Sequence, residues 1–243
     1  MRVTSSRNGG GSVLSTLLSV EAVCAGYGQI PVLRDVSISV EPGQVVALLG
    51  LNGAGKTTTL RAVSGVIPAQ SGTVKWKGMP TSAPLHRRAR AGLAYVSEER
   101  SIFRQLSTRD NMRAAGVTSV GALELFPELS SRLHVKAGLL SGGEQQMLAL
   151  SLALGRSPEL LLIDELSLGL APQVVERLLR TVRNAADAGL GVLVVEQSIR
   201  RVLDIADAAY VLQRGEVVLS GSAATLRGRV SEIEASYFEA RSN

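Results

Sequence analysis

Short apolar runs recur along this chain, each bounded by glycine or polar residues. Runs of this length that are rich in leucine and valine are typical of strands buried on both faces of a parallel sheet. Segments with one apolar face lie among them and predict helices at residues 173–188 and 199–206, and a further helix is expected at residues 57–63, after a glycine-rich segment. The alternation predicts an α/β fold with parallel strands at residues 45–49, 92–96, 160–164, 192–196 and 209–213.

Strands of another kind lie among turns near the start of the chain. Residues 19–24, 34–40 and 73–77 predict an antiparallel β part. Near the other end, residues 214–216 indicate a turn between two short strands, and the chain from Ala224 onward is predicted to be a helical tail.

The strand at residues 45–49 leads into GLNGAGKT, which fits the phosphate-loop pattern G-x-x-x-x-G-K-[ST]. Glycines let successive backbone N–H groups curl around a phosphate, the lysine reaches the β and γ phosphates, and the hydroxyl binds Mg²⁺. A strand before the loop and a helix after it supply the context that this motif needs. We therefore expect a nucleotide to be bound by Gly50, Asn52, Gly53, Ala54, Gly55, Lys56, Thr57 and Thr58.

A later strand ends in two carboxylates. Residues 160–163 are apolar, and Asp164 and Glu165 follow at the C-terminal edge of the strand, where α/β sheets bind their ligands. Beside a phosphate loop, Asp164 is expected to hold Mg²⁺ together with Thr57. Glu165 is expected to orient and deprotonate the attacking water.

Between these two motifs lies LSGGEQQ at residues 140–146. Ser141 is a helix-capping residue, Gly142 and Gly143 leave backbone donors exposed, and a helix-forming run follows. Such a segment is either a plain N-cap or a helix start that faces an anion. Its position before the acidic strand favours the second interpretation.

Together these motifs resemble those of ABC transporter ATP-binding subunits, with matches spread from near Tyr27 to near Ser222. The resemblance implies an α/β fold with a P-loop NTPase (RecA-like) core, an antiparallel β subdomain and a short inserted helical signature subdomain. It also implies ATP and Mg²⁺ as cofactors, with catalysis by positioning and electrostatics.

Three positions resemble the subgroup that serves branched-chain amino acid importers. Glu98 stands where ABC ATPases at large have glutamine, Ala171 where most have aspartate, and Gln197 at the position of the switch histidine. Residues 124–127, ELFP, are also typical of that subgroup. By this resemblance we expect Glu98 to take part in catalysis and Mg²⁺ binding. Gln197 is expected to position water or the γ phosphate without adding charge.

The resemblance further implies how the parts work. Two such domains dimerise head to tail, so that ATP on one phosphate loop is covered by Ser141, Gly142 and Gly143 of the other subunit. Tyr27 matches the aromatic residue on which adenine stacks, with a tyrosine that merely ends a strand as the alternative.

Two features depart from the family pattern. Leu166 follows Glu165 where the family usually has proline, so the turn regains an N–H and slightly looser placement of Glu165 is expected. Residues 112–123 are shorter than the family's helical insert, which normally grips the membrane partner. This departure puts coupling to a membrane partner in question, but not the ATP chemistry.

Composition fits one globular domain with an insert. The chain has 243 residues, 45% hydrophobic and 19% charged, and can bury one substantial core. We expect a flexible tail at residues 1–15, an ABC ATPase domain at 16–223 with its helical subdomain at 98–155, and a helical tail at 224–243. The single cysteine, Cys24, excludes an internal disulfide and is interpreted as a buried small hydrophobe in a strand.

The charge and hydropathy patterns exclude several classes of protein. No run of 18 or more apolar residues occurs, and the N-terminal residues lack the apolar core of a signal peptide. The net charge of +5 is carried by scattered basic residues and only 3% of residues are aromatic, so no nucleic-acid partner is expected. The densest basic cluster, residues 86–90, is interpreted as a solvated helix face, with contact to anionic lipid or a protein partner as alternatives.

The expected partners are integral membrane permease subunits, a second ABC ATPase subunit in a heterodimer and, indirectly, an external solute-binding protein. We expect this chain to lie peripherally at the cytoplasmic face of the plasma membrane. The leading hypothesis is an importer of branched-chain amino acids or of related solutes such as urea or amides. A soluble ABC ATPase usually has a second ABC domain or a long insert, which this chain lacks. A regulatory subunit with little hydrolysis conflicts with the presence of Lys56, Thr57, Asp164 and Glu165.

Overall fold

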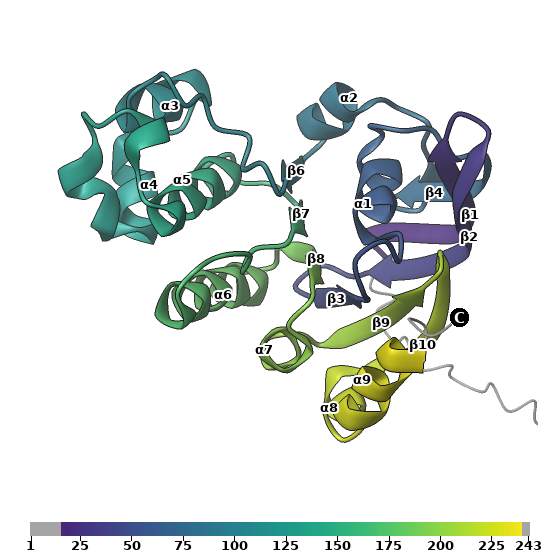
Figure 1. Ribbon diagram of the computed structural model, residues 1–243. Helices are drawn as coiled ribbons and strands as arrows, with labels where there is room; N and C mark the ends of the chain where they lie inside the picture. The colour runs from purple at the N-terminus through teal and green to yellow at the C-terminus, as the bar shows by residue number, and fades with distance from the viewer. Residues whose placement is uncertain (1–15, 240–243) are drawn as a thin grey trace, which may run out of the picture.

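The computed structural model describes residues 16–239, which form two sheets flanked by helices (Figure 1). In this part of the chain the larger sheet has six strands in the order β10-β9-β3-β8-β7-β6, all parallel to their neighbours except the pair β9 and β10. The strands are β3 (Val45–Leu49), β6 (Leu93–Val96), β7 (Leu160–Asp164), β8 (Gly191–Glu196), β9 (Ala208–Gln213) and β10 (Glu216–Ser222). The predicted parallel strands are confirmed, with each bound within one residue of its expected position.

The smaller sheet is antiparallel throughout, as predicted, and has the order β2-β1-β4-β5. Its strands are β1 (Leu18–Tyr27), β2 (Ile30–Val40), β4 (Ser71–Trp76) and β5 (Met79–Pro80). The first two are longer than predicted because they continue to a tight hairpin, where Gly28 has a φ of 59°. Cys24 lies in β1 but is half-buried, and its Sγ accepts a hydrogen bond from the Asp35 N–H at 3.5 Å. The interpretation of Cys24 as a fully buried residue is therefore wrong.

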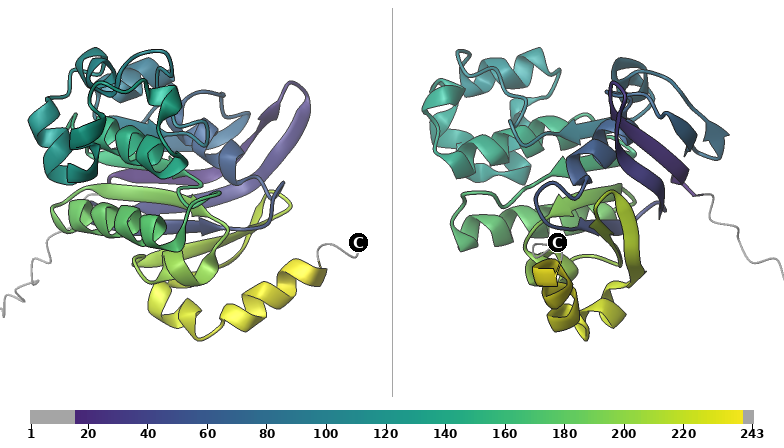
Figure 2. Two further views of the ribbon diagram at one scale, coloured as in Figure 1. Left: turned by 60° about the vertical axis from the view of Figure 1, so that its left-hand side comes forward. Right: turned by 45° about the vertical axis from the view of Figure 1, so that its right-hand side comes forward.

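Helices connect and cover the strands. Their bounds are α1 (Lys56–Ser64), α2 (Leu85–Arg90), α3 (Thr108–Ala114), α4 (Ser119–Leu125), α5 (Gly142–Leu154), α6 (Pro172–Asp187), α7 (Ile199–Leu203), α8 (Ala223–Arg227) and α9 (Val230–Glu239), with 3₁₀ turns η1 (Pro127–Arg132) and η2 (Ala137–Leu139). The predicted helices are confirmed, although α7 ends three residues earlier than expected. The predicted C-terminal tail forms two short helices, which Figure 2 shows beside one another below the sheet.

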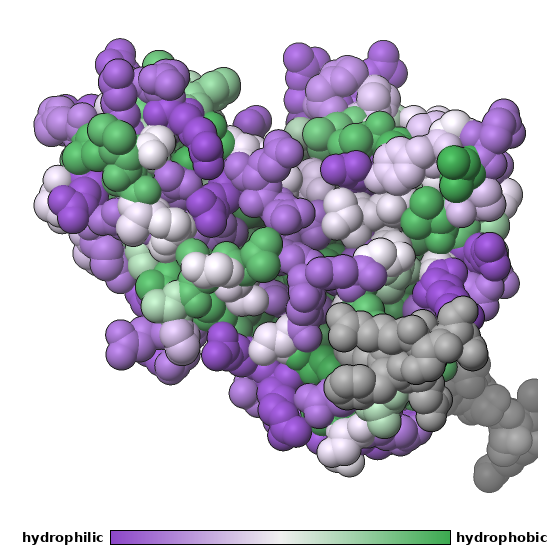
Figure 3. Space-filling model, viewed as in Figure 1, coloured by the Kyte–Doolittle hydropathy of each residue, from purple (hydrophilic) through white to green (hydrophobic). Residues whose placement is uncertain are grey.

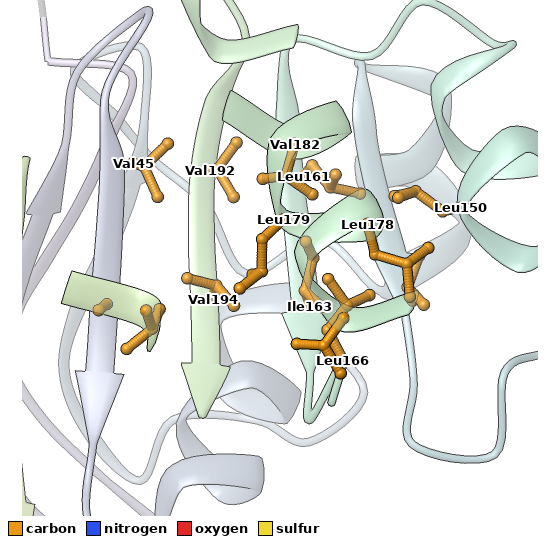
Figure 4. Close-up of a cluster of buried hydrophobic side chains, with 14 of the residues drawn as sticks. Val45, Leu150, Leu161, Ile163, Leu166, Leu178, Leu179, Val182, Val192 and Val194 are labelled. Carbon is orange, nitrogen blue, oxygen red and sulfur yellow. The ribbon is translucent and has the colours of Figure 1, made fainter. Parts of the chain in front are cut away.

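The core lies on both faces of the parallel sheet, which is why its central strands are apolar along their length. One face packs against α5, α6 and α7, and the other against α1 and the antiparallel sheet. Figure 4 shows the first of these layers, with Leu179 and Val182 of α6 near Val192 and Val194 of β8. Because both faces are covered, only the ends of the strands are left to carry polar chemistry.

The helices α3, α4 and α5 lie together at one end of the molecule, away from the antiparallel sheet (Figures 1 and 2). They fall within the predicted helical subdomain at residues 98–155, although the division of the chain into domains stays a prediction. The predicted tail at residues 1–15 lies outside the described residues. Across residues 16–239, no helix has both the length and the apolar character that a bilayer crossing requires.

One member of the basic cluster is not solvated. Arg88 on α2 is 8% exposed, and its guanidinium donates to the carbonyls of Thr81 and Ala83 and of Ala62 and Val63. The last two carbonyls lie at the end of α1, where a helix leaves its final C=O groups without helical partners. The interpretation of this cluster as a solvated helix face is therefore wrong for Arg88, which ties α2 to the helix that follows the phosphate loop.

Candidate functional site

The C-terminal ends of β3, β8, β7 and β6 lie side by side at one edge of the parallel sheet. The register places Leu49 beside Glu196 and Asp164 beside Val195. The phosphate loop follows β3, and the two acidic residues of the later motif end β7. The fold thus brings residues from distant parts of the sequence to one edge, the position at which α/β sheets bind ligands.

The phosphate loop has the backbone that its glycines predict. Gly53 and Gly55 have φ values of 82° and 108°, a region that side chains disfavour. At Gly50, a Cβ atom would lie 2.5 Å from the carbonyl oxygen of Leu212, so a larger residue does not fit. The N-cap of α1 is Gly55, whose lack of a side chain leaves the first N–H groups of the helix uncapped. These donors, with Asn52 and Gly53 exposed at the loop tip, form a ready anion site.

The Lys56 ammonium is buried within this edge. Its Nζ donates to the Leu51 carbonyl at 3.1 Å and lies 3.8 Å from Oε1 of Glu165, and Lys56 is 5% exposed. Burial lowers the pKa of Lys56, while the carboxylates of Glu165 and Asp164 oppose this shift. The lysine is therefore positioned between the loop and the acidic strand.

Asp164 is 1% exposed and accepts two hydrogen bonds. Thr57 Oγ1 donates to its Oδ1 at 3.2 Å, and the Tyr95 hydroxyl donates to its Oδ2 at 3.4 Å. Burial raises the pKa of Asp164, against the hydrogen bond from Thr57. A hydroxyl and a carboxylate in contact are the hard oxygen ligands that Mg²⁺ prefers.

A protein cage for a metal ion is not present in residues 16–239, where no group of three or more His, Cys, Asp or Glu side chains could hold one. Mg²⁺ in nucleotide sites usually takes one or two protein ligands and completes its shell with phosphate oxygens and water. The pair Thr57 and Asp164 fits that mode of binding.

Both the backbone and the side chain of Glu165 are held by residues at or just after the end of β8. Its N–H donates to the Val195 carbonyl at 3.0 Å, its φ is 53°, and Gln197 Nε2 donates to both carboxylate oxygens at 2.8 Å. The next residue, Leu166, is 1% exposed and packs near Ile163 in the core (Figure 4). Burial of Leu166 and the bond to β8 restrict the turn, while the slightly looser placement expected from the missing proline stays a prediction.

Glu98 follows β6 and is exposed. Its charge is near enough to Asp164 to contribute to the raised pKa of that residue. Two residues further, Arg100 donates to Oε1 of Gln145 at 2.6 Å and to Oε1 of Gln146 at 3.0 Å. This segment therefore links the edge of the sheet to α5.

Tyr27 ends β1 and is 44% exposed. Arg61 of α1 donates to its hydroxyl at 2.9 Å, and the guanidinium carbon lies 5.9 Å from the ring centroid. The ring is thus anchored beside the helix of the phosphate loop. This arrangement suits an aromatic platform for a base, although Tyr27 also ends a strand as the alternative interpretation requires.

The signature segment begins α5 with a complete capping box. Ser141 Oγ accepts from the Glu144 N–H at 3.2 Å, and Glu144 Oε2 accepts from the Ser141 N–H at 2.8 Å. The predicted serine cap is confirmed. A Cβ atom at Gly143 would lie 2.9 Å from a methyl group of Val174, so the helix start packs closely on the residues around the start of α6.

The comparison with known families decides the class of protein. A family model described as ABC transporter matches residues 33–167. The high-affinity branched-chain amino acid transport ATP-binding protein BraG of Pseudomonas aeruginosa is 39% identical over 86% of this chain and 94% of its own length. The chain belongs to the ABC transporter family. As an ABC ATPase, it binds and hydrolyses ATP.

Other relatives show the breadth of the family. The lipopolysaccharide export system ATP-binding protein LptB of Acidithiobacillus ferridurans is 37% identical over 86% of this chain and 91% of its own length. The structure of an ATP-binding subunit of an ABC transporter superposes with a TM-score of 0.78 at 27% identity, covering 92% of this chain and all of the other. A nucleotide-free ATP-binding cassette has a TM-score of 0.79 at 22% identity over 89% of this chain and 95% of its own, which shows a shared fold.

Three residues of this ABC ATPase were missed by the sequence reasoning. Tyr95 contacts Asp164, Arg100 contacts α5, and Glu196 of β8 is a buried carboxylate at 2% exposure. A signal for Glu196 was available, since it ends an apolar strand in the same way as Asp164. No local pattern marks Tyr95 or Arg100, whose partners are far away in the sequence.

Proposed function

We propose that this chain is the ATP-hydrolysing subunit that energises a membrane importer, with branched-chain amino acids as the transported solutes. The observation that carries the catalytic part is the position of Glu165, whose carboxylate lies 3.8 Å from the Lys56 ammonium and accepts from Gln197 at 2.8 Å. A carboxylate held beside Lys56, the cation that binds the γ phosphate, can align a water molecule for in-line attack on that phosphate.

Positioning and electrostatics account for the chemistry. Lys56 exchanges the Leu51 carbonyl and Glu165 for phosphate oxygens when ATP binds, which neutralises charge that develops during transfer. Thr57 and Asp164 would hold Mg²⁺, which would supply further positive charge at the phosphates. Glu165 orients the attacking water and accepts its proton, while Gln197 donates to Glu165 and keeps its carboxylate oriented.

A complete nucleotide site needs a second subunit. A Cβ atom at Gly142 would lie nearest to Leu170 and Arg100, and one at Gly143 nearest to Val174, so neither glycine adjoins the phosphate loop of its own chain. We therefore propose that Ser141 and both glycines cover ATP bound to the partner ATPase, and that adenine stacks on Tyr27. The partner is expected to be a related ABC ATPase, so that the dimer is a heterodimer.

The solute is proposed from residues and relatives together. The protein BraG is named for branched-chain amino acid transport, and so is LivF of Archaeoglobus fulgidus, which is 37% identical over 82% of this chain and 89% of its own length. LptB has similar identity and is named for lipopolysaccharide export, so identity alone does not separate the two. Glu98, Ala171 and Gln197, which resemble the amino acid importer subgroup, favour the first solute.

Membrane coupling is proposed through the helical end of the molecule. A cavity of about 870 Å³ lies between β6 and the helices α3 and α5. Phe103, which lines this cavity, is 63% exposed. At the same end of the molecule, Val120 is 69% and Leu139 is 76% exposed. Figure 3 shows apolar patches among hydrophilic residues at this end of the molecule. We propose that a permease segment occupies this groove and holds the chain at the cytoplasmic face of the membrane.

Affinity purification tests the proposal. The full chain, tagged at its C-terminus, is recovered from native membranes in mild detergent with ATP, and its companions are identified by mass. A polytopic permease and a second ABC ATPase are the expected companions, and the solute follows from the binding protein of that permease.

A matched pair of variants shows whether the groove is the contact. Phe103→Ser is expected to reduce permease recovery, whereas Val218→Ser, at 50% exposure on β10, leaves it unchanged. Recovery from the soluble fraction alone contradicts the importer and favours a soluble ABC ATPase.

A further inference from the structure

Three successive residues, the last two of β8 and the one that follows it, hold the turn after β7. Val195 accepts from the Glu165 N–H, Glu196 accepts from Ser167, and Gln197 donates to the Glu165 carboxylate. The first and third of these contacts act on Glu165 directly. The middle contact acts two residues further along, where the chain leaves the edge of the sheet.

Both oxygens of the Glu196 carboxylate accept hydrogen bonds from Ser167. Its Oε1 accepts the Ser167 N–H at 2.9 Å, and its Oε2 accepts the Ser167 hydroxyl at 2.6 Å. Glu196 is 2% exposed in a strand whose other residues are apolar and buried. Burying a carboxylate is costly unless hydrogen bonds replace water, so packing alone does not explain an acidic residue at this position.

The turn that Glu196 holds contains strained backbone. Glu165 has a φ of 53°, which is unusual for a residue with a side chain, and such conformations persist only where the surroundings over-determine them. A proline at the next position would fix one dihedral angle of the turn, but this chain has Leu166 there. The two hydrogen bonds from Ser167 to Glu196 constrain the backbone immediately after Leu166.

We propose that Glu196 is a positioning residue for ATP hydrolysis, which fixes the turn at residues 165–167 through Ser167 and thereby keeps the Glu165 carboxylate aimed at the attacking water. The inference rests on the proposed role of Glu165 as the base. Glu196 itself touches no reacting atom.

The chemistry of the contact provides a discriminating substitution. In Glu196→Gln, the amide oxygen accepts the Ser167 N–H, and the amide NH₂ donates to the Ser167 hydroxyl, which is both donor and acceptor. Glu196→Ala retains neither bond. Ser167→Ala removes only the hydroxyl bond, and Ser167→Thr keeps a hydroxyl at that position.

The test measures kcat, the KM for ATP and the equilibrium Kd for ATP with the full chain and each variant in the purified complex with the partner ATPase. Misplacement of a reacting group lowers the rate of the chemical step, so Glu196→Ala is expected to lower kcat about tenfold or more, with the Kd for ATP within about twofold. Glu196→Gln is expected to keep most of the wild-type kcat, and Ser167→Ala to lie between the two. Ser151→Ala, which removes a buried hydroxyl bond to Leu148 on α5, is the matched control and leaves kcat unchanged.

Several results overturn the inference. They are an unchanged kcat in Glu196→Ala, an equal loss in Glu196→Gln and Glu196→Ala, and a parallel loss of kcat and ATP affinity. If Glu196→Ala fails to fold, the pair Ser167→Ala and Ser167→Thr decides, since only the first is expected to lose kcat. Glu165→Gln separates this inference from the proposed role of Glu165 as the base. Undiminished hydrolysis by that variant would contradict the role of Glu165, whatever the results for the Glu196 variants.

Discussion

The catalytic edge of the sheet and the signature segment at the start of α5 differ in burial and in how far along the chain their hydrogen-bond partners lie. At the edge, Lys56, Asp164 and Glu196 are 5%, 1% and 2% exposed, and each has a partner from a distant part of the chain. In the signature segment Ser141 is exposed, and its capping bonds go to Glu144, three residues away. The first region is held together by tertiary contacts within its own chain. The second is a helix start built from local contacts, and we propose that it contacts the nucleotide of the partner subunit.

The largest effect is expected at the edge. Glu165→Gln removes the proposed base but keeps the side chain's size, so hydrolysis is expected to fall by about 10² or more with ATP binding retained. Single-turnover hydrolysis and equilibrium binding of labelled ATP measure the two quantities. Glu176→Gln, which breaks an exposed pair with Arg180, is the control and keeps both. Wild-type hydrolysis by Glu165→Gln would place the base elsewhere.

The signature segment can be separated from ordinary helix capping. Ser107 caps α3 by accepting from the Asp110 N–H, as Ser141 caps α5. Alanine at either position is expected to cost about 1 kcal/mol of unfolding free energy. Only Ser141→Ala is expected to reduce hydrolysis, by about tenfold or more, because we propose that its hydroxyl and helix start face a developing charge on the partner's nucleotide. Chemical denaturation and ATPase rates of the purified complex check both parts, and equal rates in the two variants would make the signature a plain N-cap.

A smaller effect is expected at Gln197, which holds Glu165 without charge. Gln197→His keeps an N–H donor, and its hydrolysis rate is expected to stay within about tenfold of the wild-type rate. Gln197→Ala frees the Glu165 carboxylate, and its hydrolysis rate is expected to be lower than that of Gln197→His. Steady-state ATPase rates at saturating ATP compare the two. Complete loss of activity in the histidine variant contradicts the view that Gln197 acts by orientation alone.

The smallest effect distinguishes the two regions by pH. Burial raises the pKa of Glu196, whereas the Arg132 side chain lowers that of Glu144 in the capping box. Glu196, whose pKa is raised, contributes stability below its unfolded pKa, and this stability is lost as pH rises through its folded pKa. Glu144, whose pKa is lowered, contributes stability above its unfolded pKa, and this stability is lost as pH falls through its folded pKa. As pH rises from the acid range to neutrality, Glu196→Gln is therefore expected to gain stability relative to wild type, and Glu144→Gln to lose it. Denaturation midpoints across that range measure the differences, and a shared sign refutes the contrast.

The sequence by itself determined the elements and the identity of the main chemical groups. The phosphate loop, the acidic strand and the serine cap are short segments whose glycines, carboxylates and hydroxyl act on backbone within a few residues. The parallel strands were predictable because burial on both faces leaves an apolar run that no other element of that length requires. These features depend on local sterics and on hydrophobic pattern, which are present in the chain before it folds.

The tertiary structure decided which partner each buried polar group finds. Glu196 bonds Ser167, Tyr95 bonds Asp164, and Arg88 reaches the end of α1, although no periodicity relates the members of each pair. It also showed that the turn after Glu165 is held without proline, through burial of Leu166 and contacts to β8. Such contacts depend on the order and register of the strands, and a buried donor or acceptor must be satisfied by whichever group that arrangement brings within reach.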